Sequence, residues 1–285
     1  MTGEPSAAGP GVPGPGRSPR SPIEPDWAKG LDRLAPLSLN AWLRFDVVSR
    51  LFPTGVRDVL EIGCGQGGFG ARLAQRYDYV GIEPDPASFA VAERRLRLAG
   101  AGGTAKVANI RLEQLPAARF DVVCAFEVLE HLDDDAAALA AWAARLRPGG
   151  WLLLSVPAYQ HRYGPADELV GHFRRYDPAA LHALLTGAGL TDVRLRHYGM
   201  PLGYLLEAAR NRLARRRLRS VAGATAPQRS AASGRLLQPS APLRGLLHRW
   251  GTAPFRWTQR AAPNTGPGLI ALARLAPDPS PGPAR

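Results

Sequence analysis

Residues 58–68 read Asp58-Val-Leu-Glu-Ile-Gly-Cys-Gly-Gln-Gly-Gly68, and they join a strand pattern to a glycine-rich turn. Its first five residues are mostly apolar and partly β-branched, which predicts a short buried strand. The glycines that follow satisfy the spacing G-x-G-x-x-G, and residues 69–77 then show the apolar period of a helix. A strand, a tight glycine turn and a helix in this order are typical of a unit that binds a ligand at the helix N-terminus.

Strand patterns alternate with helix patterns along most of the chain. The predicted strands are residues 58–62, 79–82, 105–110, 120–126, 151–156, 192–197 and 268–273. The predicted helices are residues 39–52, 69–77, 87–98, 135–146, 178–188 and 203–217, and residues 157–176 and 220–242 are predicted loops. This alternation predicts an α/β fold with a doubly wound, Rossmann-like sheet.

The carboxylate of Glu61 distinguishes between two classes of ligand. Glu83 follows Gly63 by 20 residues, a spacing that suits a dinucleotide. However, Glu61 would end its strand beside the pyrophosphate of a dinucleotide, and like charges at close range repel each other. A ligand that carries an ammonium and a sulfonium, such as S-adenosylmethionine, would be attracted instead, and Glu83 would still bridge its ribose hydroxyls.

Four motifs together resemble those of the class I S-adenosylmethionine-dependent methyltransferases. They are Glu61-Ile-Gly-Cys-Gly-Gln-Gly67, Val80-Gly-Ile-Glu-Pro-Asp85, Phe120-Asp-Val-Val-Cys-Ala-Phe-Glu-Val-Leu-Glu-His-Leu132 and Leu146-Arg-Pro-Gly-Gly150. The resemblance extends roughly over residues 40–200. It implies a mostly parallel, seven-stranded sheet with one antiparallel strand near the C-terminus, and residues 268–273 match that strand.

The resemblance also implies one methyltransferase domain, residues 26–276, with residues 201–264 inserted before the last strand. It implies that the cofactor is S-adenosylmethionine and that its site is formed by Glu61, Gly63, Cys64, Gly65, Gly67, Glu83, Pro84, Leu112 and Phe126. One position departs from the pattern of the family. Many relatives carry an Asp-Ala pair before Leu-Pro, where this chain has Arg111 and Leu112. We therefore expect the backbone of Leu112 to contact adenine, with Asn109 as the alternative.

Two histidines are the candidate catalytic residues. His131 follows the fourth predicted strand and His172 lies in the loop after the fifth, so both are expected at the carboxyl edge of the sheet. Methyl transfer needs an acceptor held in line with the sulfonium carbon, and a base where the acceptor carries a proton. The alternatives are a capping or packing role for His131 and a structural Asp–Arg network in residues 163–176.

The sequence predicts no metal site, because no Cys/His cluster has the spacing of metal ligands. The pair Glu127 and Glu130 does not change this expectation. The predicted function is methyl transfer to a small molecule, a glycan or a lipid-linked acceptor. Two alternatives stay open: a methyltransferase-like module that binds cofactor without turnover, and a nicotinamide-dependent oxidoreductase, against which Glu61 argues.

The net charge of +12 is carried entirely by the C-terminal part of the chain. Residues 1–200 contain 22 basic and 22 acidic side chains, whereas residues 201–285 contain 14 arginines and two acidic side chains. Trp250, Phe255 and Trp257 lie among these arginines, a composition typical of an interfacial anchor. We therefore expect residues 201–264 to contact an anionic membrane surface, with a solvated charged loop as the alternative. No nucleic-acid partner is expected, because no recognisable RNA- or DNA-binding module is present.

The chain ends and the cysteines bear on where the protein works. Residues 1–25 contain seven Pro and five Gly, which predicts a disordered tail, and residues 277–285 form a second tail. No run of about 18 apolar residues is present, so no membrane-spanning helix is predicted. Cys64 and Cys124 cannot form a disulfide framework in a chain of 285 residues, which suits a reducing compartment. We expect a cytoplasmic protein that is peripheral on the inner membrane face.

Overall fold

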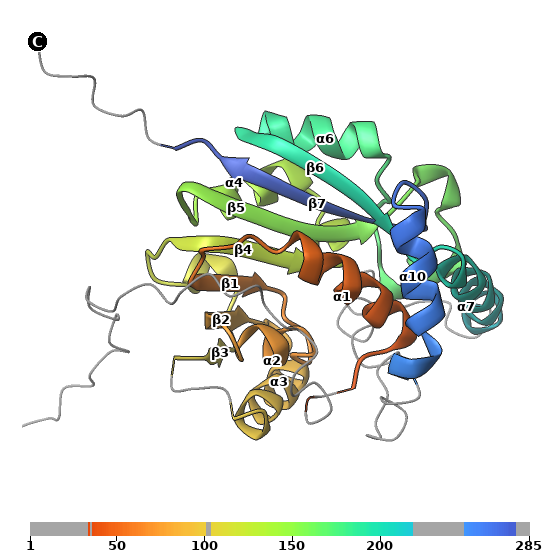
Figure 1. Ribbon diagram of the computed structural model, residues 1–285, viewed down its shortest axis with the longest axis horizontal. Coiled ribbons are helices and arrows are strands. Elements are labelled where there is room, and N and C mark those ends of the chain that lie inside the picture. The colour runs from red at the N-terminus through yellow and green to blue at the C-terminus, as the bar shows by residue number, and fades with distance from the viewer. Residues whose placement is uncertain (1–33, 35, 101–103, 219–247, 278–285) are drawn as a thin grey trace, which may run out of the picture.

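The computed structural model describes residues 34, 36–100, 104–218 and 248–277, whose strands form one seven-stranded sheet (Figure 1). The order of the strands is β3-β2-β1-β4-β5-β7-β6. They are β1 (Asp58–Ile62), β2 (Asp78–Ile82), β3 (Lys106–Ala108), β4 (Phe120–Phe126), β5 (Leu146–Pro157), β6 (Leu190–Tyr198) and β7 (Gly268–Leu275). β7 is antiparallel to both of its neighbours, and the other pairs are parallel. The predicted fold class is therefore confirmed.

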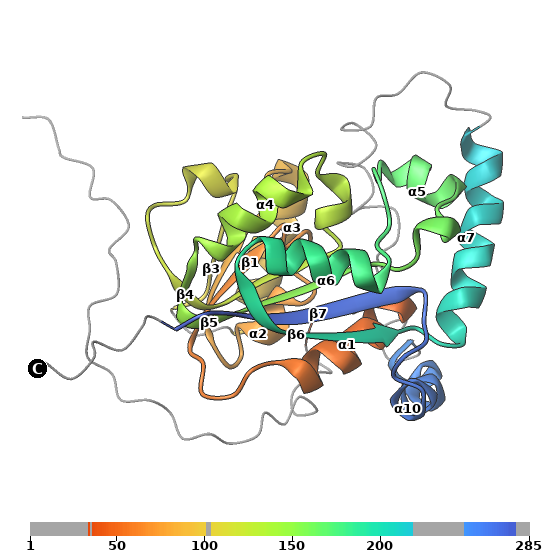
Figure 2. The ribbon, with the colours of Figure 1, turned by 90° about the horizontal axis from the view of Figure 1, so that it is seen from above.

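Helices cover both faces of the sheet (Figure 2). One apolar cluster joins the strands to α4 and α6 through side chains such as Leu139 and Leu181. A second cluster on the opposite face includes Phe45 of α1 and Leu73 of α2. The helices are α1 (Leu39–Leu51), α2 (Gly70–Leu73), α3 (Pro86–Leu98), α4 (Asp135–Ala143), α5 (Pro165–Val170), α6 (Pro178–Gly187), α7 (Leu202–Leu218) and α10 (Ala253–Ala261).

The start of α3 shows how local sequence fixes the ligand edge of the sheet. Asp85 caps this helix by accepting a hydrogen bond from the backbone N–H of Ser88 at 2.9 Å. Pro86 occupies the first turn, where its missing N–H costs nothing. The helix therefore begins immediately after β2, and the short connection between them holds Glu83 at the edge.

Two predicted boundaries are wrong where β5 begins. The helix expected to end at residue 146 ends at Ala143, and the strand expected at residue 151 starts at Leu146. The pairing of β5 with β4 shifts register between Leu146 and Trp151, so that the Pro-Gly-Gly sequence forms an irregularity within the strand. Gly150 fits there because it has no side chain, and a Cβ would lie 2.8 Å from the carbonyl oxygen of Arg147. In addition, α5 forms within the predicted loop 157–176.

The helices α7 and α10 lie in the segment between β6 and β7, and Figures 1 and 2 place both beside the carboxyl ends of the parallel strands. α10 is attached to α1, because the Gln259 side chain donates to the carbonyl of Leu43 at 2.9 Å and Arg260 pairs with Asp46. The predicted tail 1–25, the predicted loop 220–242 and residues 278–285 of the second tail lie outside the described residues. None of the described helices is long and apolar enough to cross a membrane.

Candidate functional site

The glycine turn after β1 presents open backbone at the ligand edge. Gly63, Gly65 and Gly67 have φ angles of 65°, 54° and 71°, a region that disfavours residues with a side chain. A Cβ at Gly63 would lie 2.8 Å from Val128, and one at Gly67 would lie 3.0 Å from the backbone of Ala92. At Gly65, by contrast, no described atom lies within 4 Å of a Cβ position. A ligand can therefore approach the backbone closely at this point.

Glu83 connects the end of β2 to the glycine turn. Its carboxylate accepts hydrogen bonds from the backbone N–H groups of Gly65 at 2.8 Å and Asp85 at 2.9 Å. Each carboxylate oxygen keeps a further lone pair, so both can still accept hydrogen bonds from ligand hydroxyls. Asn109, which the sequence offers as an adenine contact, donates its side-chain amide to the Glu83 carbonyl at 2.7 Å and so braces this strand end.

Glu61 is buried near the glycine turn, with 3% of its surface exposed. The hydroxyl of Tyr79 donates a hydrogen bond to its Oε2 at 2.6 Å. Burial raises the pKa of Glu61 to about 7, although the hydrogen bond from Tyr79 and the charge of Arg44 act in the opposite direction. The carboxyl group therefore changes charge near neutral pH. The sequence does not predict this role of Tyr79, because its position in the chain indicates only that it belongs to a strand.

Both cysteines are buried. Cys124 lies opposite Glu61 in the pairing of β4 with β1, and Cys64 lies in the glycine turn that follows β1. Burial raises the pKa of both thiols well above its ordinary value, so neither forms a thiolate near neutral pH.

The other predicted cofactor residues lie at or after the ends of β2, β3 and β4. Pro84 is exposed beside Glu83. Phe126 ends β4 and packs against the ring of Phe69, with ring centroids 4.8 Å apart. Leu112 begins a short 3₁₀ turn, and its carbonyl accepts a hydrogen bond from Arg145 at 3.1 Å. The Leu112 carbonyl therefore already has a partner within the protein.

The ligand edge has a second half, formed by the segments that follow β4 and β5. Glu127 is its first residue. Its φ of 59° is a strained conformation for a residue with a side chain, and such strain concentrates at functional sites. Its Oε1 accepts hydrogen bonds from Ser155 at 2.9 Å and Tyr198 at 3.1 Å, and it lies 3.0 Å from Arg44. Burial acts to raise the pKa of Glu127, but the charges of Arg44 and His172 and the two side-chain hydrogen bonds together outweigh it, and the pKa is lowered. The Oε1 atom of this carboxylate thus has three partners.

The structure brings the two predicted catalytic histidines together. The ring centroids of His131 and His172 are 4.6 Å apart, with the planes at 81°. Burial lowers the pKa of His131 to about 4, and the neighbouring charge of His172 acts in the same direction. His131 is therefore neutral at physiological pH. Nδ1 of His172 lies 2.8 Å from Oδ1 of Asp167, a contact that fixes the orientation of its ring.

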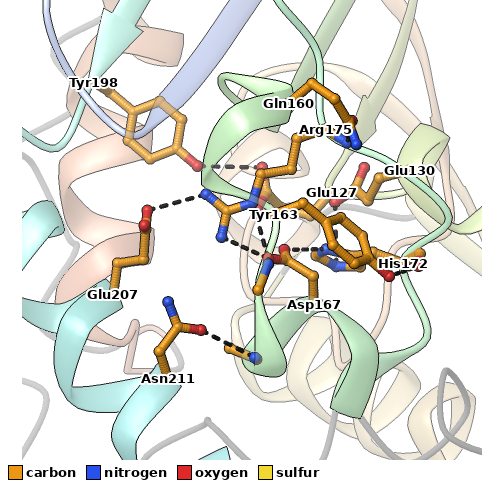
Figure 3. Close-up of polar contacts among 12 residues, drawn as sticks. Glu127, Glu130, Gln160, Tyr163, Asp167, His172, Arg175, Tyr198, Glu207 and Asn211 are labelled. Carbon is orange, nitrogen blue, oxygen red and sulfur yellow. Dashed lines mark hydrogen bonds and ion pairs between the residues drawn. The ribbon is translucent and has the colours of Figure 1, made fainter.

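A buried ion-pair network fixes the loop that carries His172 (Figure 3). Arg175 donates from Nε and Nη2 to Oδ2 of Asp167 at 2.9 and 2.7 Å. Its Nη1 reaches Oε2 of Glu207, on α7, at 3.1 Å, and Arg162 pairs with the other oxygen of Glu207 at 3.0 Å. The Asp–Arg network that the sequence offers as an alternative is present, and it orients the histidine rather than replacing it.

Three donor side chains converge at this end of the edge, where the sequence predicts no metal site. Glu130, His131 and His172 each present one donor atom, and these atoms all lie within 4.8 Å of one another. The first two belong to the turn after β4, and the third comes from the loop after β5. Because His172 is 41 or more residues from the other two donors in sequence, no local spacing predicts the cluster.

Relatives with similar sequences carry methyltransferase names. A probable S-adenosylmethionine-dependent methyltransferase of Mycobacterium tuberculosis is 36% identical over 162 residues, which are 55% of this chain and 58% of that protein. The ubiquinone biosynthesis O-methyltransferase of Leptothrix cholodnii is 37% identical over 130 residues, 44% of this chain and 52% of that protein. The chain thus spans little more than half the length of these curated relatives.

Solved structures share the fold at low sequence identity. The phosphoethanolamine N-methyltransferase 2 of Haemonchus contortus, in complex with S-adenosyl-L-methionine, matches with a TM-score of 0.51 and 18% identity over 86% of this chain and 54% of that one. The [4+2]-cyclase SpnF matches with a TM-score of 0.50 and 18% identity over 83% and 82%. Since one fold can serve different reactions, this likeness shows the fold alone. The family model described as a methyltransferase domain matches residues 24–195, well over half of the chain, and the chain therefore belongs to that methyltransferase family.

Proposed function

We propose that the chain transfers the methyl group of S-adenosylmethionine to a small-molecule or lipid-linked acceptor. The observation that carries this proposal is the pair of carboxylates on either side of the open glycine turn, Glu61 at β1 and Glu83 after β2. A cationic ligand is attracted by the carboxylate of Glu61, whereas the pyrophosphate of a nicotinamide dinucleotide is repelled by it. The name of the Mycobacterium tuberculosis relative supports the same cofactor.

The cofactor's polar groups suit these residues in turn. We assign the ribose hydroxyls to Glu83, whose oxygens keep lone pairs after their backbone hydrogen bonds. We assign the ammonium and sulfonium to the field of Glu61, and the remaining surface to the positions that line the turn: Gly63, Cys64, Gly65, Gly67, Pro84, Leu112 and Phe126. The open space at Gly65 is what allows this backbone to meet a ligand.

The acceptor belongs at the other half of the edge, beside His131 and His172. In the transfer, a lone pair of the acceptor forms a bond to the methyl carbon and the carbon–sulfur bond breaks. The sulfur keeps that electron pair and becomes a neutral thioether, and the acceptor loses a proton. Much of the acceleration comes from holding the two reactants in line. A neutral imidazole is the form that accepts a proton, and His131 has it at physiological pH.

A lipid-linked acceptor is favoured by the surface of α7 and α10. Of the six large apolar side chains that are exposed in the described part of the chain, four lie in residues 201–264: Leu205, Leu213, Trp250 and Trp257. Arg212, Arg215 and Arg216 are exposed beside them. Aromatic rings at headgroup depth with arginines around them suit an anionic membrane surface, and each arginine contributes about 1 kcal/mol there.

Vesicle flotation tests the membrane contact. We expect the protein to float with anionic vesicles, to stay behind with neutral ones and to dissociate as salt rises. The double variant Trp250→Ala/Trp257→Ala should lose flotation, while Leu98→Ala, which removes an exposed side chain from α3, should keep it. If the protein does not float with anionic vesicles at low salt, the surface is a solvated charged surface instead. If it prefers an oligonucleotide competitor to the vesicles, the surface binds nucleic acid.

A labelled-methyl assay tests the activity. The chain is incubated with S-adenosylmethionine bearing a deuterated methyl group and with polar and lipid extracts, and labelled products are sought by mass spectrometry. We expect a labelled product that disappears in Glu83→Ala and persists in Glu93→Ala, a change on the exposed face of α3. Cofactor binding without a labelled product in either extract would instead indicate a module that binds without turnover.

A further inference from the structure

Glu130 is a fully buried carboxyl group whose two oxygens have no hydrogen-bond partner among the described residues. Such a group is costly, because an unpaired polar atom loses its hydration and gains nothing in return. The nearby arginines do not relieve it, since Arg44 is paired with Glu127 and Arg175 with Asp167. An ionised carboxylate at Glu130 would therefore need a further counter-charge.

Two imidazoles face this carboxyl group (Figure 3 shows Glu130 and His172). Nε2 of His172 lies 3.8 Å from Oε1 of Glu130, too far for a hydrogen bond but close enough for a bridging atom. His131 completes the group, with donor atoms all within 4.8 Å of one another. Metal–ligand bonds of about 2.0–2.2 Å place donors ~3–4 Å apart, so a movement of ~1 Å would close the three around one ion.

The outer contacts of both rings also match those of metal-bound histidines. Nδ1 of His172 bonds to the Asp167 carboxylate at 2.8 Å, and a carboxylate accepts only, so this nitrogen carries the proton. Nε2 then presents its lone pair toward Glu130. His131 makes its own hydrogen bond to the backbone of Gly171. A histidine that donates one N–H to a carboxylate or carbonyl and offers the other nitrogen is the usual metal-ligating arrangement.

We propose that Glu130, His131 and His172 bind one divalent transition cation of the zinc type and leave at least one position open. Two imidazoles and one carboxylate suit zinc and related first-row ions better than Mg²⁺ or Ca²⁺, which prefer oxygen ligands. The ion would supply the counter-charge that an ionised Glu130 would need. Its catalytic role rests on the proposed function: an open position would bind an acceptor hydroxyl and lower its pKa, which favours transfer to oxygen, and the ion would take the place of His131 as the group that promotes loss of the proton.

Cobalt absorption tests the site without any activity measurement. Full-length protein is stripped of metal with a chelator and titrated with Co²⁺, whose visible absorption becomes intense in a four- or five-coordinate nitrogen and oxygen site. We expect this absorption to appear in the wild-type protein and to be displaced by Zn²⁺. It should be lost in Glu130→Gln and His172→Asn and kept in His182→Ala, which removes an exposed histidine of α6. Asp167→Asn should weaken Co²⁺ binding ~10–100-fold, as loss of an orienting contact does.

Titration of the same samples with S-adenosylmethionine separates the two proposals. Binding of the cofactor by each variant shows that it is folded, because that site lies at the β1–β2 end. Cofactor binding without the cobalt absorption, or with an absorption that Glu130→Gln and His172→Asn leave unchanged, would overturn the metal site and leave the methyltransferase proposal standing. Absence of cofactor binding in the wild-type protein would overturn the methyltransferase proposal, whatever the cobalt result.

Discussion

The two halves of the ligand edge differ in how their buried carboxylates are satisfied. At the β1–β2 half, Glu61 accepts a hydrogen bond from Tyr79 and Glu83 accepts two from the backbone, all within a short stretch of sequence. At the β4–β5 half, Glu130 is buried without a hydrogen-bond partner among the described residues, and His172 reaches it from a distant loop. The first half is prearranged by local sequence, whereas the second depends on long-range contacts that leave Glu130 unpaired in the described part of the chain.

The largest expected effect separates the two halves by their roles. Because His131 and His172 belong to the acceptor half, His131→Ala and His172→Ala should lower kcat by ~10²–10⁴, the usual contribution of a positioned acid or base. Cofactor Kd should change little in both. The measurement is kcat together with cofactor Kd, with His182→Ala as the control. Lost cofactor binding with unchanged turnover per bound cofactor would mean that the halves are assigned wrongly.

Removal of Arg175 tests whether the acceptor half is held by its buried network. Arg175→Ala leaves Asp167 and Glu207 buried without this partner and should cost ~3–5 kcal/mol in the free energy of unfolding. Arg97→Ala breaks an exposed ion pair with Glu93 and should cost less than about 1 kcal/mol. Denaturant unfolding of both variants gives the comparison. Equal losses would show that the network does not stabilise the loop.

Removal of Glu83 tests the cofactor half. Glu83→Ala deletes a charged acceptor for two hydroxyls and should weaken S-adenosylmethionine binding by ~1.5–3 kcal/mol, as the loss of hydrogen bonds to a charged group does. Glu93→Ala, an exposed change on α3, serves as the control in calorimetric titrations. Unchanged cofactor affinity in both Glu83→Ala and Glu61→Ala would refute this half of the site.

The pH dependence of cofactor binding gives the smallest effect. Burial raises the pKa of Glu61 to about 7, so its neutral form prevails below that pH in the free protein. A cationic ligand favours the ionised form, and affinity should therefore rise with pH through this range. Between about pH 6 and about pH 7 the ionised fraction, and with it the affinity, should rise about five-fold. Glu61→Gln should lack this rise, and an identical pH profile in both proteins would contradict the assignment.

Local sequence predicts the cofactor half well because its parts are neighbours in the chain. The strand, the glycine turn and Glu83 lie within 26 residues, and the hydrophobic pattern fixes their order. The arrangement of the acceptor half can be predicted from the sequence only in part. His131 and His172 can be placed at the edge, but their contact with Glu130 depends on a loop that is fixed by the ion pair of its own Arg175 with Glu207 of α7. No periodicity or spacing encodes such a contact between distant segments.

Calorimetric titration of the wild-type protein with S-adenosylmethionine and with NAD distinguishes the two classes of ligand, because both contain an adenosine and they differ in charge beside Glu61. We expect S-adenosylmethionine to bind with a saturable heat and NAD to give none under the same conditions. Saturable binding of NAD, with none of S-adenosylmethionine, would contradict this expectation.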